Sequence, residues 1–268
     1  MTTIDAYAGI PELTVSLDDG VLSVTLNRPD SLNSLNAAMA RALADALEHA
    51  ADDPRVRVVR LGGAGRGFSS GAGISAEDQS SGRPDKPGDV LQAGNRAVRA
   101  ITSLPKPVVA VVQGPAAGIG VSLALACDIV LASEKAFFLL AFTKIGLMPD
   151  GGASALVAAS IGRARAMKMA LLAERVSAAE AFETGLVSAV YPADELEAGV
   201  AAVIDKLASG PAVALRKTKQ AINAATLTEL DAAIGRESEG QLILLGAKDF
   251  REGAKAFQEH RSPNFTDD

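Results

Sequence analysis

The chain has 268 residues, of which 48% are hydrophobic, and its 26 basic and 32 acidic side chains give a net charge of −6. This length suits one large domain, or a domain with an appended piece, and is enough to bury a well-packed core. The acidic balance argues against nucleic acid or anionic membranes as main partners. One cysteine, Cys127, excludes an internal disulfide, and only two histidines make a metal site unfavoured, so we expect no metal.

The N-terminus has no basic segment followed by an apolar one, so we expect no secretory signal and a cytoplasmic location. Residues 107–127 carry no charge and are nearly long enough to cross a bilayer. However, a Gln-Gly-Pro turn and two further glycines, Gly118 and Gly120, interrupt this stretch. We interpret it as a buried strand, a glycine turn and a buried helix, and we expect no membrane insertion.

The N-terminal part of the chain predicts a hairpin and a helix. Residues 13–17 and 21–26 alternate apolar and polar side chains around an Asp-Asp-Gly turn, which is typical of a β-hairpin. Met39, Leu43 and Leu47 then recur at every fourth position, which predicts a helix with one apolar face.

The middle of the chain predicts strands that run into glycine turns. We expect a strand at 56–61, a mobile polar loop at 75–89 and a second strand at 108–112. A helix at 121–126 and a third strand at 129–131 follow.

Beyond residue 152 the pattern is almost wholly helical. The segment from Ser177 to Glu180 has the sequence of a capping box, and Pro211 suits the start of a helix. Strand–turn–helix units followed by helices predict an α/β core over residues 1–200 and a C-terminal helical extension over residues 201–268.

Two glycine-rich turns, at 61–74 and 113–120, follow predicted strands. Glycine lets the backbone approach a ligand and present bare N–H groups, and two such turns could aim two donors at one oxygen. The alternative is that these glycines only form tight turns. A nucleotide-binding P-loop is disfavoured, because Phe68 stands where that motif has lysine.

Five motifs in order resemble the enoyl-CoA hydratase/isomerase (crotonase) superfamily over nearly the whole chain. They lie at residues 27–36, 67–74, 113–128 (QGPAAGIGVSLALACD), 144–152 (KIGLMPDGG) and 252–257 (EGAKAF). The resemblance implies an α/β fold of the crotonase-type ββα spiral and an acyl-CoA thioester substrate. Coenzyme A is then part of the substrate, and no separate cofactor is expected. The resemblance also implies a homotrimer or dimer of trimers formed through the C-terminal helices, which carry the apolar residues Leu242, Ile243 and Leu245.

Carried over to this chain, the resemblance places the two donors of an oxyanion hole on the backbone N–H groups of Ala72 and Ile119. Gly71 and Gly118 would shape the two turns. His260 stands where the family usually has lysine, so a plain surface histidine is an equal alternative to a contact with coenzyme A. The residues implied to line the coenzyme A groove are Asn36, Ala72, Gly73, Ile74, Phe257 and His260.

The chain departs from the hydratases of the family at both catalytic glutamates, which correspond to Ser122 and Phe142. Adding water to an enoyl thioester needs a base for the water and an acid for the α-carbon, and neither residue supplies them. Isomerases of the superfamily keep an acid after the proline of KIGLMPD, and Asp150 matches it. The alternative role for Asp150 is a helix N-cap.

The sequence therefore favours an enoyl-CoA isomerase in which Asp150 moves a proton between the α and γ carbons. The apolar Phe142 beside it would raise its pKa. Two alternatives stay open: an enoyl-CoA hydratase and a non-catalytic acyl-CoA-binding protein.

Overall fold

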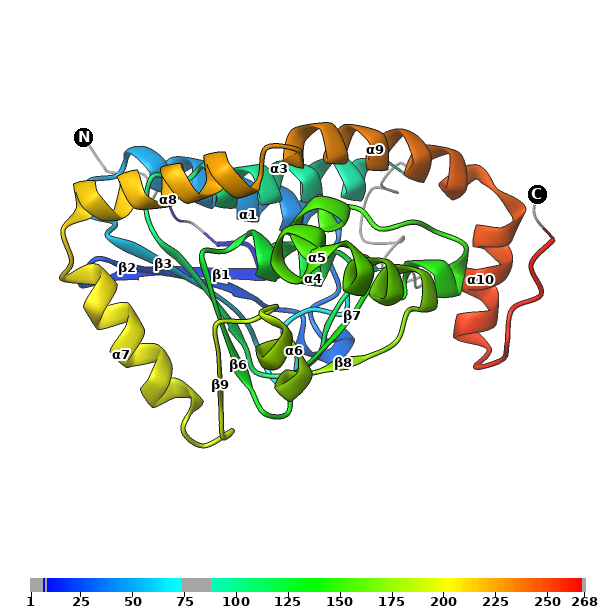
Figure 1. Ribbon diagram of the computed structural model, residues 1–268, viewed down its shortest axis with the longest axis horizontal. Helices are drawn as coiled ribbons and strands as arrows, with labels where there is room; N and C mark the ends of the chain where they lie inside the picture. The colour runs from blue at the N-terminus through cyan, green and yellow to red at the C-terminus, as the bar shows by residue number, and fades with distance from the viewer. Residues whose placement is uncertain (1–6, 8, 74–87, 267–268) are drawn as a thin grey trace.

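A computed structural model describes residues 7, 9–73 and 88–266 (Figure 1). Ile74 and nearly all of the predicted loop at 75–89 lie outside the described residues; its last residue, Asp89, begins a helix.

The main sheet has six strands in the order β1-β2-β3-β4-β6-β9. The β1–β2 hairpin is antiparallel and every other pairing is parallel. The strands are β1 (Leu13–Asp18), β2 (Val21–Leu26), β3 (Val58–Gly63), β4 (Val108–Val112), β6 (Ile129–Ser133) and β9 (Ala189–Tyr191). The predicted hairpin and the predicted strands at 108–112 and 129–131 are confirmed. β3 begins two residues later than predicted, because its pairing with β2 starts where Val58 faces Val21.

A second sheet of three short strands contains β5 (Ala116–Ala117), β7 (Phe137–Leu139) and β8 (Val176–Ser177). β5 is parallel to β7, and β8 is antiparallel to it. The prediction that the chain is almost wholly helical beyond residue 152 therefore misses β8 and β9. Strands of two or three residues are too short to show an alternating pattern.

Helices cover both faces of the main sheet. The segment between β3 and β4 includes α3, which the sequence pattern did not reveal. The described helices are α1 (Ala37–Asp52), α3 (Asp89–Ser103), α4 (Ile119–Ala126), α5 (Ala153–Leu172), α6 (Ala178–Thr184), α7 (Leu196–Ala208), α8 (Ala212–Thr226), α9 (Leu230–Gly246) and α10 (Lys248–Gln258), with short 3-10 helices η1 (Pro29–Ser31) and η2 (Ala141–Ile145). The predicted helix signals hold: the Ser177 hydroxyl caps α6 by accepting from the Glu180 N–H, and Pro211 is the N-cap of α8.

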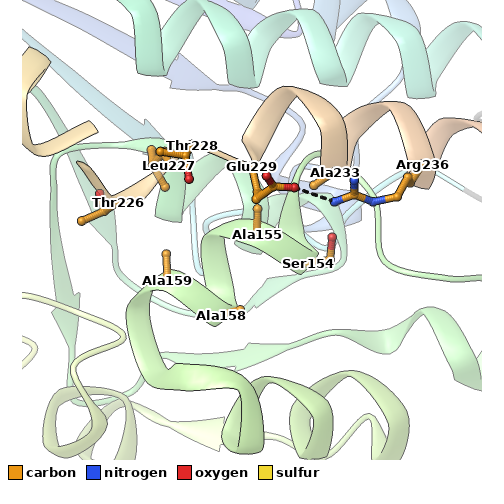
Figure 2. Close-up of a pocket in the computed structure, with 10 residues that line it drawn as sticks. All are labelled: Ser154, Ala155, Ala158, Ala159, Thr226, Leu227, Thr228, Glu229, Ala233 and Arg236. Carbon is orange, nitrogen blue, oxygen red and sulfur yellow. Dashed lines mark hydrogen bonds and ion pairs between the residues drawn. The ribbon is translucent and has the colours of Figure 1, made fainter. Parts of the chain in front are cut away.

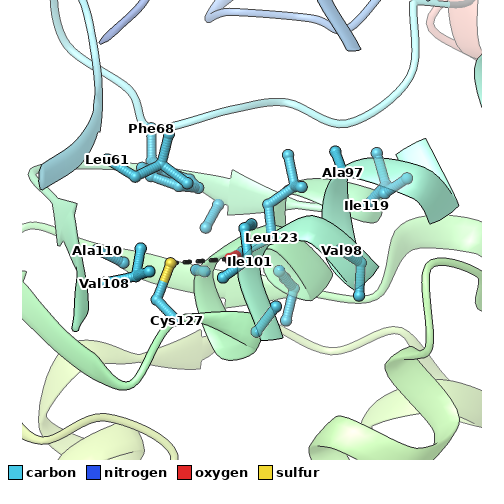
Figure 3. Close-up of a cluster of buried hydrophobic side chains, with 14 of the residues drawn as sticks. Leu61, Phe68, Ala97, Val98, Ile101, Val108, Ala110, Ile119, Leu123 and Cys127 are labelled. Carbon is cyan, nitrogen blue, oxygen red and sulfur yellow. Dashed lines mark hydrogen bonds between the residues drawn. The ribbon is translucent and has the colours of Figure 1, made fainter. Parts of the chain in front are cut away.

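The larger core lies between the main sheet and helices α1, α3 and α4. Figure 3 shows Phe68 beside Leu61 and the packing of Ile101 and Leu123 from α3 and α4. Alternate residues of the same strands face the other side, where α7 covers them with a smaller apolar cluster. Cys127 is buried in the larger core, which supports a packing role for it.

The C-terminal helices lie along the molecule and around one end of it (Figure 1). α9 contributes Leu230 and Ile234 to the larger core, whereas α10 packs against η2. Among the described residues no single helix is long and apolar enough to cross a membrane. The pair α7 and α8 passes that test together by length and composition, but is bent by 106°.

Candidate active site

The two glycine turns predicted from the sequence meet in the structure. A Cβ placed on Gly71 would lie 2.9 Å from the carbonyl oxygen of Ala117 and 3.4 Å from the Cα of Gly118. Both glycines have positive φ, +94° at Gly71 and +53° at Gly118. A side chain at Gly71 would be strained and would collide with backbone, so glycine is required where the turns touch.

Backbone pairing leaves the predicted donors free. Leu35 donates to the Gly71 carbonyl over 2.8 Å and accepts from the Gly73 N–H over 2.9 Å, which fixes the backbone on both sides of Ala72. Ile119 is the first residue of α4, where an N–H has no partner within the helix. Within residues 9–73 and 88–266, neither the Ala72 nor the Ile119 N–H donates a hydrogen bond to another residue.

Two buried or half-buried side-chain amides, for which no role was predicted from the sequence, support the first turn. The Asn33 amide donates to the carbonyls of Gly67 and Ala64 over 2.8 and 2.9 Å. The Gln113 amide donates to the Gly63 and Gly67 carbonyls over 2.7 Å each. Both residues lie inside the motifs that carry the family resemblance, and that was the signal available in the sequence.

Asp150 is a buried carboxylate, 7% exposed, in the loop between η2 and α5. Its Oδ2 accepts a hydrogen bond from the Gln241 side-chain amide over 2.9 Å, and its Oδ1 has no partner among the described residues. Burial raises the pKa of Asp150 to about 7; the Gln241 bond opposes this rise and the Glu237 charge adds to it. The carboxylate can therefore exist in either protonation state near neutral pH.

The alternative role of Asp150 as a helix cap is not what the structure shows. α5 begins at Ala153, its N-cap is Gly152, and the N-cap residue makes no side-chain capping bond. The orphan N–H groups at this end instead donate to Glu237, from Gly152 over 2.6 Å and from Ser154 over 2.8 Å. The carboxylate of Asp150 is thus free for another role.

The Asp150 loop packs against the start of α4, next to the glycine turns. A Cβ on Gly151 would lie 2.9 Å from the Cβ of Ser122 and 3.0 Å from the Cγ1 of Ile119. Phe142 approaches from η2, and its ring would lie 3.8 Å from a Cβ on Gly118. The structure therefore brings together the predicted acid, both turns and the two positions of the absent glutamates.

Two residues of α9, Glu237 and Gln241, belong to the site but were not predicted. They are 1% and 2% exposed and lie one helical turn apart. The sequence did contain a sign of their role. Leu230, Ala233 and Ile234 form the buried face of α9, and the next two positions on that face are polar where apolar residues are expected.

Of the predicted coenzyme A residues, Ala72 and Gly73 lie in the first turn, and Asn36 follows Leu35, which pairs with that turn. Asn36 is buried and caps α1, its side chain accepting from the Met39 N–H over 2.8 Å. Phe257 is 61% exposed on α10, and His260, just beyond that helix, is exposed as well. Their contact with coenzyme A stays a prediction, as does that of Ile74, which lies outside the described residues.

A shallow hollow lies between α5 and the start of α9 (Figure 2). Small side chains such as Ala155 and Ala159 line it, and the Glu229–Arg236 ion pair stands at its edge. Ser154 links it to Glu237, but no predicted site residue lines it. The residues that the structure describes contain no group of three His, Cys, Asp or Glu side chains that could hold a metal ion.

A buried carboxylate lies beside two turns whose Ala72 and Ile119 N–H groups have no partner in the described part of the chain, and such a site can transfer a proton next to a stabilised oxyanion. The family model described as enoyl-CoA hydratase/isomerase matches residues 16–268. The chain belongs to the enoyl-CoA hydratase/isomerase family, whose members act on acyl-CoA thioesters.

Similar proteins confirm the predicted crotonase-type fold. The chain is 40% identical over 252 residues to 1,2-epoxyphenylacetyl-CoA isomerase of Escherichia coli, covering 93% of this chain and 96% of that protein. It is 34% identical over 254 residues to 2,3-dehydroadipyl-CoA hydratase of the same organism, covering 95% and 98%. A crystal structure of an enoyl-CoA hydratase from Mycobacterium avium subsp. paratuberculosis K-10 matches with a TM-score of 0.91 and 66% identity, over 97% of this chain and 100% of that one. Relatives thus include both isomerases and hydratases.

Proposed function

We propose that this protein shifts a double bond in an enoyl-CoA, with Asp150 as the group that removes and returns the proton. The observation that carries the proposal is the buried Oδ1 of Asp150, which has no hydrogen-bond partner among the described residues. It belongs to a loop packed against the first turn of α4, where the predicted oxyanion donor Ile119 lies.

The chemistry follows from these positions. The thioester oxygen accepts hydrogen bonds from the Ala72 and Ile119 N–H groups, which makes the α proton of a 3-enoyl-CoA acidic. Asp150 removes that proton, the electron pair spreads over a dienolate, and the same carboxyl returns the proton to the γ carbon. Each oxyanion donor contributes about 3–4 kcal/mol to such a transition state. A carboxyl with a pKa of about 7 is a stronger base than an ordinary aspartate and still ionises near neutral pH.

Hydration lacks the second acid–base group that it needs. The Ser122 hydroxyl is buried and donates to the Asp150 carbonyl over 2.8 Å, so it is already engaged. Phe142 cannot ionise. These two residues favour the isomerase over the hydratase activity carried by some relatives.

The test is the turnover of a 3-enoyl-CoA and a 2-enoyl-CoA, followed by the absorbance of the conjugated thioester and by product mass. We expect the 3-enoyl substrate to become the 2-enoyl product without gain of mass, and Asp150→Asn to abolish this. Asp205→Asn, at an exposed position of α7, is the control. Gain of one water by the 2-enoyl substrate would favour the hydratase. Binding of both thioesters without turnover would favour the non-catalytic binder.

We also propose that the helices of residues 201–268 assemble the chain into a trimer or a dimer of trimers. Support comes from apolar side chains left exposed on α8 and α9, among them Ile222 and Ile243, the latter 75% exposed. Surfaces of this kind commonly mark interfaces. Sedimentation analysis tests the assembly, and Ile243→Lys should lower the measured mass if this face is buried between copies.

A further inference from the structure

We propose that Gln241 and Glu237 of α9 are positioning residues for Asp150: Gln241 holds its carboxyl group through Oδ2, Glu237 holds the backbone that follows it, and Oδ1 is left to exchange the proton with the substrate. This inference rests on the proposed function of Asp150. It assigns a role at the site to α9, whose Gln241 bonds to Asp150 although the two residues are 91 positions apart in the sequence.

The Gln241 side chain is fixed at both ends. Its oxygen accepts from the Met148 N–H over 3.1 Å, while its nitrogen donates to the Asp150 Oδ2 over 2.9 Å. A backbone N–H can only donate, so the amide oxygen must face Met148 and the NH₂ group must face Asp150. The bond therefore occupies Oδ2 and leaves the buried Oδ1 as the oxygen without a partner among the described residues.

Glu237 holds the backbone on the other side of Asp150. One carboxylate oxygen accepts from the Gly152 N–H over 2.6 Å, and the other accepts from the N–H and hydroxyl of Ser154 over 2.8 and 2.5 Å. Glu237 thus satisfies the start of α5 in place of Asp150. Burial raises the pKa of Glu237 itself, and the hydrogen bonds from Ser154 and Gly152 oppose that rise. In its ionised form, its negative charge disfavours ionisation of the neighbouring Asp150.

The two residues therefore act on the Asp150 pKa in opposite directions. The hydrogen bond from Gln241 favours the charged carboxylate, whereas the charge of Glu237 favours the neutral acid. The other ionisable side chains on the described elements around the loop are either exposed or bonded to residues other than Asp150. Lys144 of η2 is exposed, Arg236 of α9 pairs with Glu229, and Asp249 of α10 accepts from the Thr266 N–H. From α4, the loop contacts the uncharged Ile119 and Ser122.

The test compares Gln241→Met and Glu237→Gln by the pH profile of kcat/KM for a 3-enoyl-CoA. Gln241→Met should move the acidic limb to higher pH and lower kcat about ten- to hundredfold with KM little changed, because the carboxyl loses its orientation but substrate contacts remain. Glu237→Gln should move the same limb to lower pH. A purely structural role predicts no such pair of opposite shifts.

Ser238→Ala is the matched control, because Ser238 lies between the two on α9 and bonds to Asn95 of α3, not to Asp150. The acidic limb of its pH profile should lie at the same pH as that of the wild type. The proposal is overturned if the limbs of Gln241→Met and Glu237→Gln stay in place, move together, or move no more than that of Ser238→Ala. If thermal unfolding shows that Glu237→Gln does not fold, the upward shift of Gln241→Met against Ser238→Ala decides.

A second readout separates this proposal from the proposed function. Carbon-13 NMR of labelled aspartate carboxyls, with the Asp150 signal assigned through Asp150→Asn, follows the titration without any substrate. If the wild type turns over no enoyl-CoA, opposite shifts of this titration in the two variants would still support the positioning roles. Unshifted titrations would overturn them even in an active isomerase.

Discussion

The Ser122 hydroxyl donates a hydrogen bond to the carbonyl oxygen of Asp150 over 2.8 Å. Ser122 occupies the position at which hydratases of the family carry a catalytic glutamate, by the resemblance described above. Asp150, the proposed acid, lies on the loop that faces Ser122, and the Ser122 hydroxyl bonds to that loop. Because Gly151 packs directly against Ser122, a larger side chain at position 122 would displace the loop that carries Asp150.

Removing this hydroxyl should affect the reaction more than the fold. Ser122→Ala leaves one buried carbonyl with fewer partners, which costs about 1 kcal/mol of the free energy of unfolding. We expect kcat for the 3-enoyl substrate to fall about tenfold, since Asp150 loses one of its supports, with KM little changed. Ser160→Ala is the control, because the Ser160 hydroxyl also donates to a backbone carbonyl, but within α5. Equal kcat values in the two variants would contradict a positioning role for Ser122.

The buried Asp150 should make the protein less stable as the pH rises. Its pKa lies at about 7 in the folded chain and near 3.8 in an unfolded one. Below the lower value both states are protonated, and between the two the unfolded state loses its proton first. Stability therefore falls from about pH 4 to pH 7 and then levels off. A difference of about three pH units corresponds to about 4 kcal/mol.

Asp150→Asn should remove this dependence. We expect the variant to unfold at a higher temperature than the wild type at pH 8, and the gap to shrink strongly by pH 5, where the wild-type carboxyl is protonated in the folded state. Thermal unfolding at a series of pH values measures this. A gap that is constant with pH would contradict a raised pKa for Asp150.

Much of the fold could be predicted from local patterns. The hairpin around Asp-Asp-Gly, the strand at 108–112 and the apolar face of α1 each depend on residues close together in the sequence. The short strands β8 and β9 could not, since they form only by pairing with β7 and β6. The same limit explains why β3 begins at Val58: its start is set by its partner strand.

The residues of the site likewise fall into those that local motifs indicate and those that only folding brings together. The glycine turns and Asp150 lie in local motifs, so the sequence indicated them. Gln241 and Glu237 lie in an ordinary helical pattern, and only folding brings them to the Asp150 loop. For Asp150 itself, the local sequence was compatible with a helix cap or a catalytic acid. The structure shows that Glu237 satisfies the start of α5, which no pattern near Asp150 could reveal.

The contact between the two glycine turns predicts a severe effect of a single methyl group. Gly71→Ala places a Cβ 2.9 Å from the Ala117 carbonyl oxygen and 3.4 Å from the Gly118 Cα, so the turns must separate. We expect kcat/KM to fall at least about a hundredfold, as when an oxyanion donor is removed. Gly162→Ala is the control for backbone strain alone, because Gly162 has a similar φ of +76° with no atom within 4 Å of a Cβ. It should lose stability and keep its activity; equal losses of activity in both variants would contradict a role of the Gly71 contact in the site.

A partly buried ion pair attaches α8 to the turn before β6, where Asp128 also accepts a hydrogen bond from the Val108 N–H of β4. The Lys219 ammonium lies 2.9 Å from the Asp128 Oδ2 and also donates to the carbonyls of Ile101 and Lys106 over 3.0 and 3.2 Å. Burial raises the pKa of Asp128, and Lys219 opposes that rise. Removing the lysine leaves a partly desolvated carboxylate without its opposite charge.

Lys219→Met should therefore lower the free energy of unfolding by about 1.5–3 kcal/mol, measured by chemical denaturation at pH 7. Lys217→Met is the control, because Lys217 is exposed on the same helix and should change stability little. Adding Asp128→Asn to Lys219→Met should recover part of the loss, since it removes the unpaired charge while keeping the size of the side chain. If the double variant is no more stable than Lys219→Met, the loss comes from packing of the lysine stem, and the ion pair does not hold α8 to the turn before β6.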